Sequence, residues 1–239
     1  NGARKWYSPR EVDIERDERG KVIGARLKAD GEVVTVGRVE KMSKSKNNGV
    51  DPQDMVERYG ADTVRLYMMF TSAPDQKLEW SDSAVEGSSR YLKRLWRLVY
   101  EHVSGDVPPS LQGLELSDDE RALRRQTHQA IAKVGDDIGR RYTFNTAIAA
   151  LMELTNAVVR LDGKSDSARA VRGEALHAIV AMLAPIVPHM THTLWAALGG
   201  AGAVIDAPWP AIDESALASD SLALVVQVNG RLRGRIEVA

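Results

Sequence analysis

The chain has 239 residues, of which 44% are hydrophobic and 27% are charged, and 32 lysines and arginines face 33 aspartates and glutamates. This composition is that of a globular protein with a sizeable core, and the net charge of −1 excludes a uniformly basic nucleic-acid-coating protein. The lack of cysteine excludes disulfide scaffolds, thiolate zinc sites, iron–sulfur clusters and cysteine nucleophiles.

No apolar run approaches the roughly 18 to 20 residues that a membrane span requires, so no membrane partner is expected. The first ten residues carry no apolar signal core and no initiator methionine. We therefore expect a fragment of a longer protein.

Up to residue 39 the sequence predicts β structure. Apolar and charged residues alternate in 11–16, and further strand-like runs follow at 22–27 and 33–39. The last two runs are separated by Asp30-Gly31, and an Asp-Gly pair between alternating runs is a strong hairpin signal.

From Asp51 the hydrophobic period becomes helical. Asp51-Pro52 is an N-cap followed by a first-turn proline, which predicts helices over 51–59 and 61–70. The next stretch, 71–80, has no periodicity and is predicted to be a loop.

Two capping boxes mark the start of longer helices. Ser83 with Glu86 predicts a helix that runs to about Val103, and Ser117 with Glu120 predicts the start of another. The apolar pattern of that second helix runs over 123–138, and further helical patterns follow over 144–158, 171–183 and 190–195. Together these segments predict an antiparallel helical bundle.

After the bundle the sequence changes character. Residues 201–220 are rich in Ala, Pro, Asp and Ser and are predicted to be a linker, although Trp209 suggests that part of it is pinned to the bundle. Leu222–Val228 and Arg231–Val238 flank Asn229-Gly230, the pattern of a hairpin with a type I′ turn. The expected fold class is α+β and mostly α: an antiparallel helical bundle with a small N-terminal β region and a C-terminal β-hairpin.

The most informative stretch for chemistry is 41–49, which reads Lys-Met-Ser-Lys-Ser-Lys-Asn-Asn-Gly. Three ammonium groups crowd into this loop, and together with hydroxyls and free backbone N–H groups they suit a polyphosphate. A solvated charged turn is the plainer interpretation, and charge alone favours it.

The order of the residues reverses that preference. Lys41 to Ser45 is the signature loop of class I aminoacyl-tRNA synthetases, and the sequence around it resembles the bacterial leucyl-tRNA synthetases. The isoleucyl and valyl enzymes usually continue with Leu-Gly-Asn where this chain has Lys46-Asn47-Asn48. The resemblance extends over nearly the whole chain and is carried by residues 6–9, 45–52, 59–67, 78–81, 184–189, 194–195 and 225–230.

The resemblance implies an ATP-dependent ligase that activates leucine and transfers it to tRNA(Leu). Lys44 would stabilise the ATP phosphates as charge grows in the transition state, with Lys41 in support and Ser43 and Ser45 as shaping hydroxyls. Met42 joins Lys44 as an expected ATP-binding residue. The family's other ATP motif, His-Ile-Gly-His, does not occur here, so this fragment alone should not activate leucine.

The family also implies partners, a location and a domain order. The full-length enzyme would use ATP with Mg²⁺, no cofactor is expected on the fragment, and the protein is expected to be a cytoplasmic monomer. The expected segments are the end of a leucine-specific insertion, the signature loop with its following helices, the anticodon-binding bundle, a linker and the start of a C-terminal domain. They cover residues 1–39, 40–80, 81–200, 201–221 and 222–239.

A basic stripe on the long helix is the second candidate site. Arg90, Lys93, Arg94 and Arg97 repeat at spacings of three and four and so share one face. They form either a solvated helix face or a contact for tRNA phosphates, and the family resemblance favours the second interpretation.

Histidines and tryptophans give weaker signals. Glu174-x-x-His177 has the spacing of a di-iron ligand pair, but no second pair accompanies it, so a packing role is expected and no metal site. His189 and His192 are likewise expected to pack or to lie at the surface, and Trp96, Trp195 and Trp209 are expected in the core.

A function of another class stays open at this stage. The chain could be an RNA-binding or scaffold module without ligase activity, whose lysine loop is only a phosphate contact.

Overall fold

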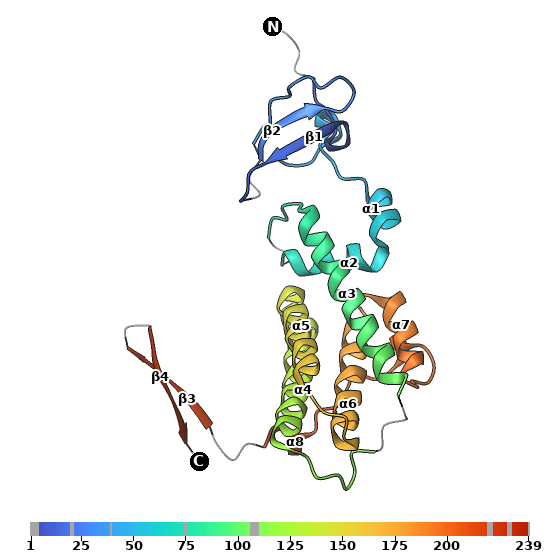
Figure 1. Cartoon of the computed structure of the whole chain (residues 1–239), viewed down its shortest axis with the longest axis vertical. Coiled ribbons are helices and arrows are strands. Elements are labelled where there is room, and N and C mark those ends of the chain that lie inside the picture. The colour runs from blue at the N-terminus through green and yellow to red at the C-terminus, as the bar shows by residue number, and fades with distance from the viewer. Residues whose placement is uncertain are drawn as a thin grey trace. The chain divides into compact units, whose positions relative to one another are not determined.

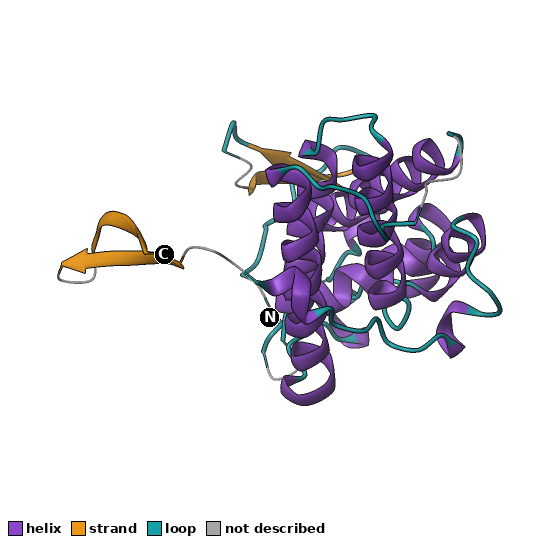
Figure 2. Cartoon of the chain, turned by 90° about the horizontal axis from the view of Figure 1, so that it is seen from below, coloured by secondary structure: helices purple, strands orange, loops and turns teal. Residues whose placement is uncertain are grey.

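The structure is a computed structural model that describes residues 5–19, 22–38, 40–73, 76–105, 110–218, 222–228 and 231–238. The chain divides into two compact units, Asn1–Arg58 and Tyr59–Ala239, each of which is described by itself. Figure 1 shows the elements in chain order, and Figure 2 shows that most of the regular structure is helical. The predicted fold class, a mostly helical α+β chain, is confirmed.

The first unit is built on a two-stranded antiparallel sheet. Strands β1 (Val12–Arg16) and β2 (Val22–Leu27) pair with Ile14 opposite Ala25, and the register shifts after Glu15. Ala25 is buried on one face of β2 while Arg26 stays exposed on the other and pairs with Glu15 at 3.0 Å. The alternation of apolar and charged residues in the sequence therefore corresponds to a sheet with one covered face.

The predicted strand over 33–39 is wrong as far as the structure describes it. Gly31 adopts a positive φ of 79° in the expected turn, but only Val33 bridges back to Arg26, and residues 34–38 form no strand. Val39 lies outside the described residues. Alternating residues form a strand only when a neighbouring strand supplies a complete ladder.

The first unit also holds a short 3₁₀ turn (η1, Pro9–Glu11), a second one in the lysine loop (η2, Lys44–Lys46) and helix α1 (Pro52–Tyr59), which ends at the first residue of the second unit. Asp51 caps α1 as predicted, since its Oδ1 accepts from the Gln53 backbone N–H at 3.0 Å.

The second unit is a helical bundle. Helices α4, α5 and α6 contact one another, and α3 and α7 pack against the same core (Figure 1). Fully buried leucines and isoleucines fill that core, each of which contributes about 1.5–3 kcal/mol of burial free energy. The helices are α2 (Ala61–Thr71), α3 (Asp82–Val103), α4 (Asp118–Asp136), α5 (Phe144–Arg160), α6 (Asp166–Leu183) and α7 (Pro188–Ala197), with a π-helical turn η3 (Asp137–Arg141) after α4.

One of the two predicted capping boxes is confirmed and the other is wrong. At α4, Ser117 accepts from the Glu120 N–H and the Glu120 carboxylate accepts from the Ser117 N–H at 2.7 Å, which confirms the prediction. At α3 the prediction was wrong, because Ser81 is the N-cap and accepts from the Ala84 N–H. Ser83 lies inside the first turn, where its hydroxyl contacts that of Ser81 at 3.0 Å.

The chain after α7 is more structured than its composition suggests. A 3₁₀ turn η4 (Val204–Asp206) and the short helix α8 (Glu214–Leu217) lie within the predicted linker. Trp209 contacts α4 at Gly135, where a side chain would be 3.3 Å from the indole nitrogen. Strands β3 (Leu222–Val228) and β4 (Arg231–Val238) then pair in the predicted antiparallel hairpin, whose turn residues lie outside the described part of the chain.

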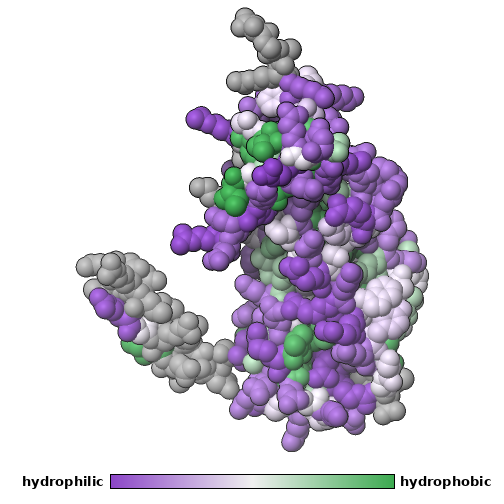
Figure 3. Space-filling model, turned by 45° about the horizontal axis from the view of Figure 1, so that its top comes forward, coloured by the Kyte–Doolittle hydropathy of each residue, from purple (hydrophilic) through white to green (hydrophobic). Residues whose placement is uncertain are grey.

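None of the described helices is long and apolar enough to cross a lipid bilayer. On the face seen in Figure 3, hydrophilic side chains cover most of the helical bundle, with only small hydrophobic patches.

Candidate functional site

The lysine loop is held in shape by a side chain that sequence reasoning missed. The Asn48 carboxamide accepts from the Ser43 backbone N–H at 2.8 Å and donates to the Lys41 carbonyl at 3.3 Å. Asn47 closes the 3₁₀ turn in the left-handed region, with φ of 47°, a conformation that asparagine adopts more readily than most residues. The Asn-Asn pair in the sequence was the available signal, because both roles suit this side chain.

Within this frame the two serines lie together. The hydroxyls of Ser43 and Ser45 are 3.3 Å apart, and Ser43 precedes the 3₁₀ turn without capping it. Both hydroxyls can therefore turn toward a ligand without giving up a bond to the backbone.

The three ammonium groups of the loop have different partners. Lys46 pairs with Glu40 and lies 5.7 Å from the centre of the Trp6 ring. Lys41 and Lys44 are exposed, and within the described part of the chain neither ammonium has an ion-pair partner. The two predicted phosphate ligands, Lys41 and Lys44, are thus the loop lysines without an ion-pair partner among the described residues, whereas Lys46 has one in Glu40.

This donor set fits phosphate oxygens. Two unpaired ammonium groups and two hydroxyls lie on a segment of five residues, and Met42 is 43% exposed between them. Among the described residues, no group of three or more histidine, aspartate or glutamate side chains could hold a metal ion. The loop thus offers donors to an anion and no carboxylate cluster to a divalent cation.

The basic stripe lies in the second unit, on α3. Arg90 is 4.0 Å from Glu86 and Arg97 is 3.7 Å from Glu101, and both arginine side chains are at least 70% exposed. Lys93 is also exposed, whereas Arg94 is half-buried. Exposed pairs of this length contribute little stability, so the stripe is free to exchange its partners for phosphates.

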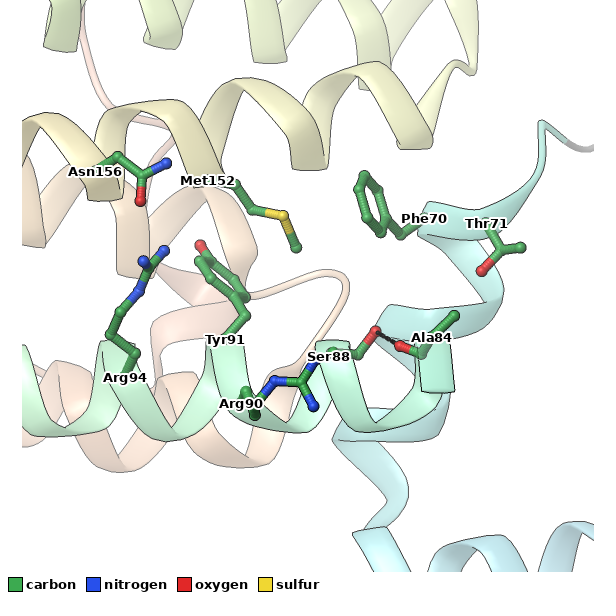
Figure 4. Close-up of a pocket in the computed structure, with 10 residues that line it drawn as sticks. Phe70, Thr71, Ala84, Ser88, Arg90, Tyr91, Arg94, Met152 and Asn156 are labelled. Carbon is green, nitrogen blue, oxygen red and sulfur yellow. Dashed lines mark hydrogen bonds between the residues drawn. The ribbon is translucent and has the colours of Figure 1, made fainter. Parts of the chain in front are cut away.

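Two hollows flank the stripe. On one side Arg90 and Arg94 line a groove of about 720 Å³ between α3, α5 and the end of α2 (Figure 4). On the other side Lys93 and Trp96 line a smaller hollow of about 300 Å³. The four predicted residues therefore share one helix face, but three of them border two different depressions and Arg97 lines neither of the two.

The tryptophan predictions need correction. Trp96 and Trp209 are 38% and 40% exposed, so neither is a core residue. Trp96 stacks on Tyr100, four residues along α3, with ring centres 4.9 Å apart. Trp195 does pack against the core, and it contacts His177 edge to face at 5.6 Å.

The histidines and Glu174 serve packing and polar contacts. Glu174 accepts from Arg124 at 3.1 Å and contacts His128 at 3.2 Å, so its carboxylate binds residues of α4. His189 is exposed and contacts Asp62 at 2.9 Å, and His192 is exposed.

A polar network fastens the segment after the bundle to α4, and no sequence signal identified it. Arg124 binds both Glu174 and Asp213, and the Asp213 N–H donates to His128 Nδ1 at 3.1 Å. Hydrogen bonds from Ser215 and Arg124 lower the pKa of Asp213 well below its usual range. The partners lie 46 to 89 residues apart in sequence, beyond the reach of local patterns.

Comparison with known proteins identifies the family to which the chain is related. Residues 120–239 match the family described as "Anticodon-binding domain of tRNA ligase", and residues 31–81 match "tRNA synthetases class I (I, L, M and V)". The chain is 57% identical over 238 residues to a leucine–tRNA ligase of Chromohalobacter salexigens and 58% identical over 240 residues to that of Alkalilimnicola ehrlichii. Both matches cover the whole chain but only 28% of the relative.

A solved structure is similar as well. The ternary complex of the Agrobacterium radiobacter K84 agnB2 LeuRS with tRNA and LeuAMS matches with a TM-score of 0.71 and 32% identity, over 83% of this chain and 26% of that one. The chain spans about 28% of the length of the curated relatives it matches. With half of its length in the family match, the chain belongs to the anticodon-binding domain family of tRNA ligases, in the form found in bacterial leucine–tRNA ligases.

Proposed function

We propose that this chain works as part of a leucine–tRNA ligase, in which the lysine loop promotes the activation of leucine by ATP and the helical bundle contacts tRNA(Leu). The observation that carries the proposal is the ion pairing of the lysines in the loop. Lys41 and Lys44 are exposed and, among the described residues, uncompensated, while the neighbouring Lys46 is paired with Glu40. The similarity to leucine–tRNA ligases along the whole chain supports the choice of reaction.

The loop's role follows from where charge develops. When the leucine carboxylate attacks the α-phosphate and pyrophosphate leaves, negative charge grows on phosphate oxygens, and a cation that meets it there lowers the barrier. Lys44 is the residue proposed for this task, since it opens the 3₁₀ turn and its ammonium is free to move. Lys41 adds a second positive charge, and Ser43 and Ser45 offer hydroxyl donors.

The loop's frame would keep these groups in register. Asn48 ties the backbone of Ser43 to that of Lys41, so the two lysines and two hydroxyls stay on one short segment while their side chains remain mobile. Met42, which is 43% exposed, would lie against ATP as an apolar contact. Mg²⁺ would enter with the nucleotide and neutralise phosphate charge, since this loop supplies donors only.

The basic stripe is proposed to bind tRNA phosphates. Arg90, Lys93 and Arg97 are exposed on one face of α3, and their intrahelical ion pairs are weak. Such contacts would position the RNA without reading its sequence. We extend the proposal to the expected segment order and to a cytoplasmic, monomeric enzyme.

The loop proposal is tested in a complete ligase that carries this chain. Lys44→Ala should slow ATP–pyrophosphate exchange by about 10² to 10³, as expected for the loss of one charged donor to a transition state. Lys46→Ala is the matched control and should cost far less, because that ammonium is already bound to Glu40. Equal losses for the two variants would contradict the assignment, and activity that survives both would favour an RNA-binding module without ligase function.

The tRNA contact has a separate test. Arg97→Glu should weaken tRNA binding and reduce the slope of log affinity against log salt by about one, because one phosphate contact is lost. A salt slope equal to that of the unmodified protein would remove Arg97 from the interface, and the same result for charge reversals at Arg90, Lys93 and Arg94 would remove the stripe.

A further inference from the structure

The groove beside the stripe has the chemistry of a nucleotide site. Its volume of about 720 Å³ lies within the ~300–1,000 Å³ range of small-ligand pockets. Figure 4 shows Met152 and Asn156 projecting from α5 toward Tyr91 and Arg94 of α3, with Phe70 of α2 at one end. Apolar and aromatic side chains thus line the middle of the groove, and polar groups meet near Asn156.

The aromatic part of the lining presents a ring rather than a polar group. Tyr91 is 5% exposed, its hydroxyl is turned to Thr155 at 3.2 Å, and burial raises its pKa to about 12. The hydroxyl is therefore neutral and already bonded, and what Tyr91 presents to the groove is the small exposed part of its ring. Met152 and Phe70 add polarizable and aromatic surface of the kind that stacks on a flat ligand.

Two polar groups in the groove lack partners. The Arg94 Nε is buried without a hydrogen-bond acceptor, and its guanidinium lies 5.9 Å from the Tyr91 ring centre. The Asn156 carboxamide has no hydrogen-bond partner within the described part of the chain. A buried unsatisfied donor costs about 1–3 kcal/mol, which is recovered if a ligand supplies the missing acceptor.

The positive charge of the groove favours an anionic ligand. Two arginines and no acidic residue line it, as far as the structure describes the lining, and it adjoins the basic stripe on the same helix. An amide that both donates and accepts, a guanidinium plane and an apolar lining together match the edge and the faces of an unstacked RNA base. Arg90 at the rim, 72% exposed, suits the phosphate of that nucleotide.

From this we infer that the groove between α3 and α5 binds one nucleotide of the RNA, its base against Met152, Phe70 and the exposed part of the Tyr91 ring and its edge against Arg94 and Asn156. The inference rests on the proposed tRNA contact and deepens it, since the stripe would position the RNA and the groove would hold a base.

The test uses a complete ligase carrying this chain and a tRNA(Leu) series in which one nucleotide at a time is abasic. Asn156→Leu should weaken binding of the unmodified tRNA about 10-fold, with no change of salt slope, because a base contact and not a phosphate is lost. Val159→Ala, at a 52% exposed position of the same helix, should leave the affinity unchanged.

The decisive comparison combines the Asn156→Leu variant with each abasic tRNA. One abasic position should lose about the same affinity as Asn156→Leu, and combining the two should cost no more than either alone. Arg94→Lys keeps the charge but not the planar fork, and it should show the same non-additivity at the same nucleotide. Circular dichroism melts would establish that each variant is folded.

Two outcomes would overturn the inference. If no abasic position is non-additive with Asn156→Leu and Arg94→Lys, the groove does not hold a base. If both variants leave tRNA affinity intact but disturb the packing of another part of the ligase, the occupant is protein. In either case an Arg97→Glu variant that still lowers the salt slope would leave the proposed tRNA contact standing.

Discussion

Replacement of Asp137 by asparagine should strongly destabilise the helical unit. The Asp137 side chain is 1% exposed in the π-helical turn. Its Oδ2 accepts from Lys133 Nζ and Thr146 Oγ1, both at 2.7 Å, and its Oδ1 accepts from Thr143 Oγ1 at 3.1 Å and Arg141 Nη1 at 3.3 Å. One carboxylate thus joins α4, the turn and the start of α5.

The magnitude follows from counting acceptors. Asparagine keeps one oxygen and turns an NH₂ group toward two of the four donors, so two hydrogen bonds are lost. At about 1.5 kcal/mol for each bond to a charged group, the expected loss is about 3 kcal/mol. Lys133 recovers some of this by hydration, because its side chain is 48% exposed.

The pH dependence has a definite sign. Burial alone would raise the pKa of Asp137, but hydrogen bonds from Lys133 and Thr146 outweigh burial and lower it from the usual 3.8. The carboxylate therefore stabilises the fold fully above that usual value and loses its contribution as the pH falls through the lower pKa of the folded state. The difference between the unmodified chain and Asp137→Asn should be constant from pH 7 to about 5 and shrink in acid.

The assay is urea denaturation of the chain, followed by far-ultraviolet circular dichroism at several pH values. Asp136→Asn is the matched control, because the neighbouring carboxylate is 39% exposed and pairs with the exposed side chain of Arg140. It should destabilise much less. Equal effects of the two variants, or a difference that persists unchanged below pH 3, would refute the role given to the buried carboxylate.

Two further stability predictions follow from close approaches in the bundle. Gly200→Ala should destabilise the chain by about 1–3 kcal/mol in thermal or urea melts, because the new Cβ would lie 2.2 Å from the Trp195 ring. Gly139→Ala, whose new Cβ would meet nothing within 4 Å beyond its chain neighbours and its own helix backbone, is the control, and a loss of equal size would contradict the steric reason. Asp62→Ala should lower the free energy of unfolding by about 1 kcal/mol, because the Met190 amide donates to Asp62 at 2.7 Å. It should also speed hydrogen exchange at that amide, and unchanged exchange would show that this bond does not fix α7.

Local patterns predicted the local structure well. The reciprocal bonds of Ser117 and Glu120 and the start of α1 at Asp51 depend on residues two or three apart, which the sequence displays directly. The choice between Ser81 and Ser83 as the cap of α3 was not visible, because it depends on which serine adopts the extended backbone conformation.

The contacts that join distant segments were not predictable. Val187 offers no side chain to cap α7, and Asp62 caps it from 128 residues away by accepting from the Met190 N–H. The groove at Asn156 likewise exists only once α3 and α5 have packed together. The signature loop was identified by residue order, whereas its internal frame, held by Asn48, depends on a loop conformation that residue order does not display.

The central claim is that Lys44 acts on the transition state of leucine activation and not on bound ATP. The most direct measurement is the single-turnover rate of leucyl-adenylate formation in a complete ligase carrying Lys44→Ala, together with the dissociation constant of ATP. We predict a rate lower by about 10² to 10³ with ATP affinity changed only a few-fold. A normal rate at saturating ATP, with the whole loss in ATP affinity, would contradict the account.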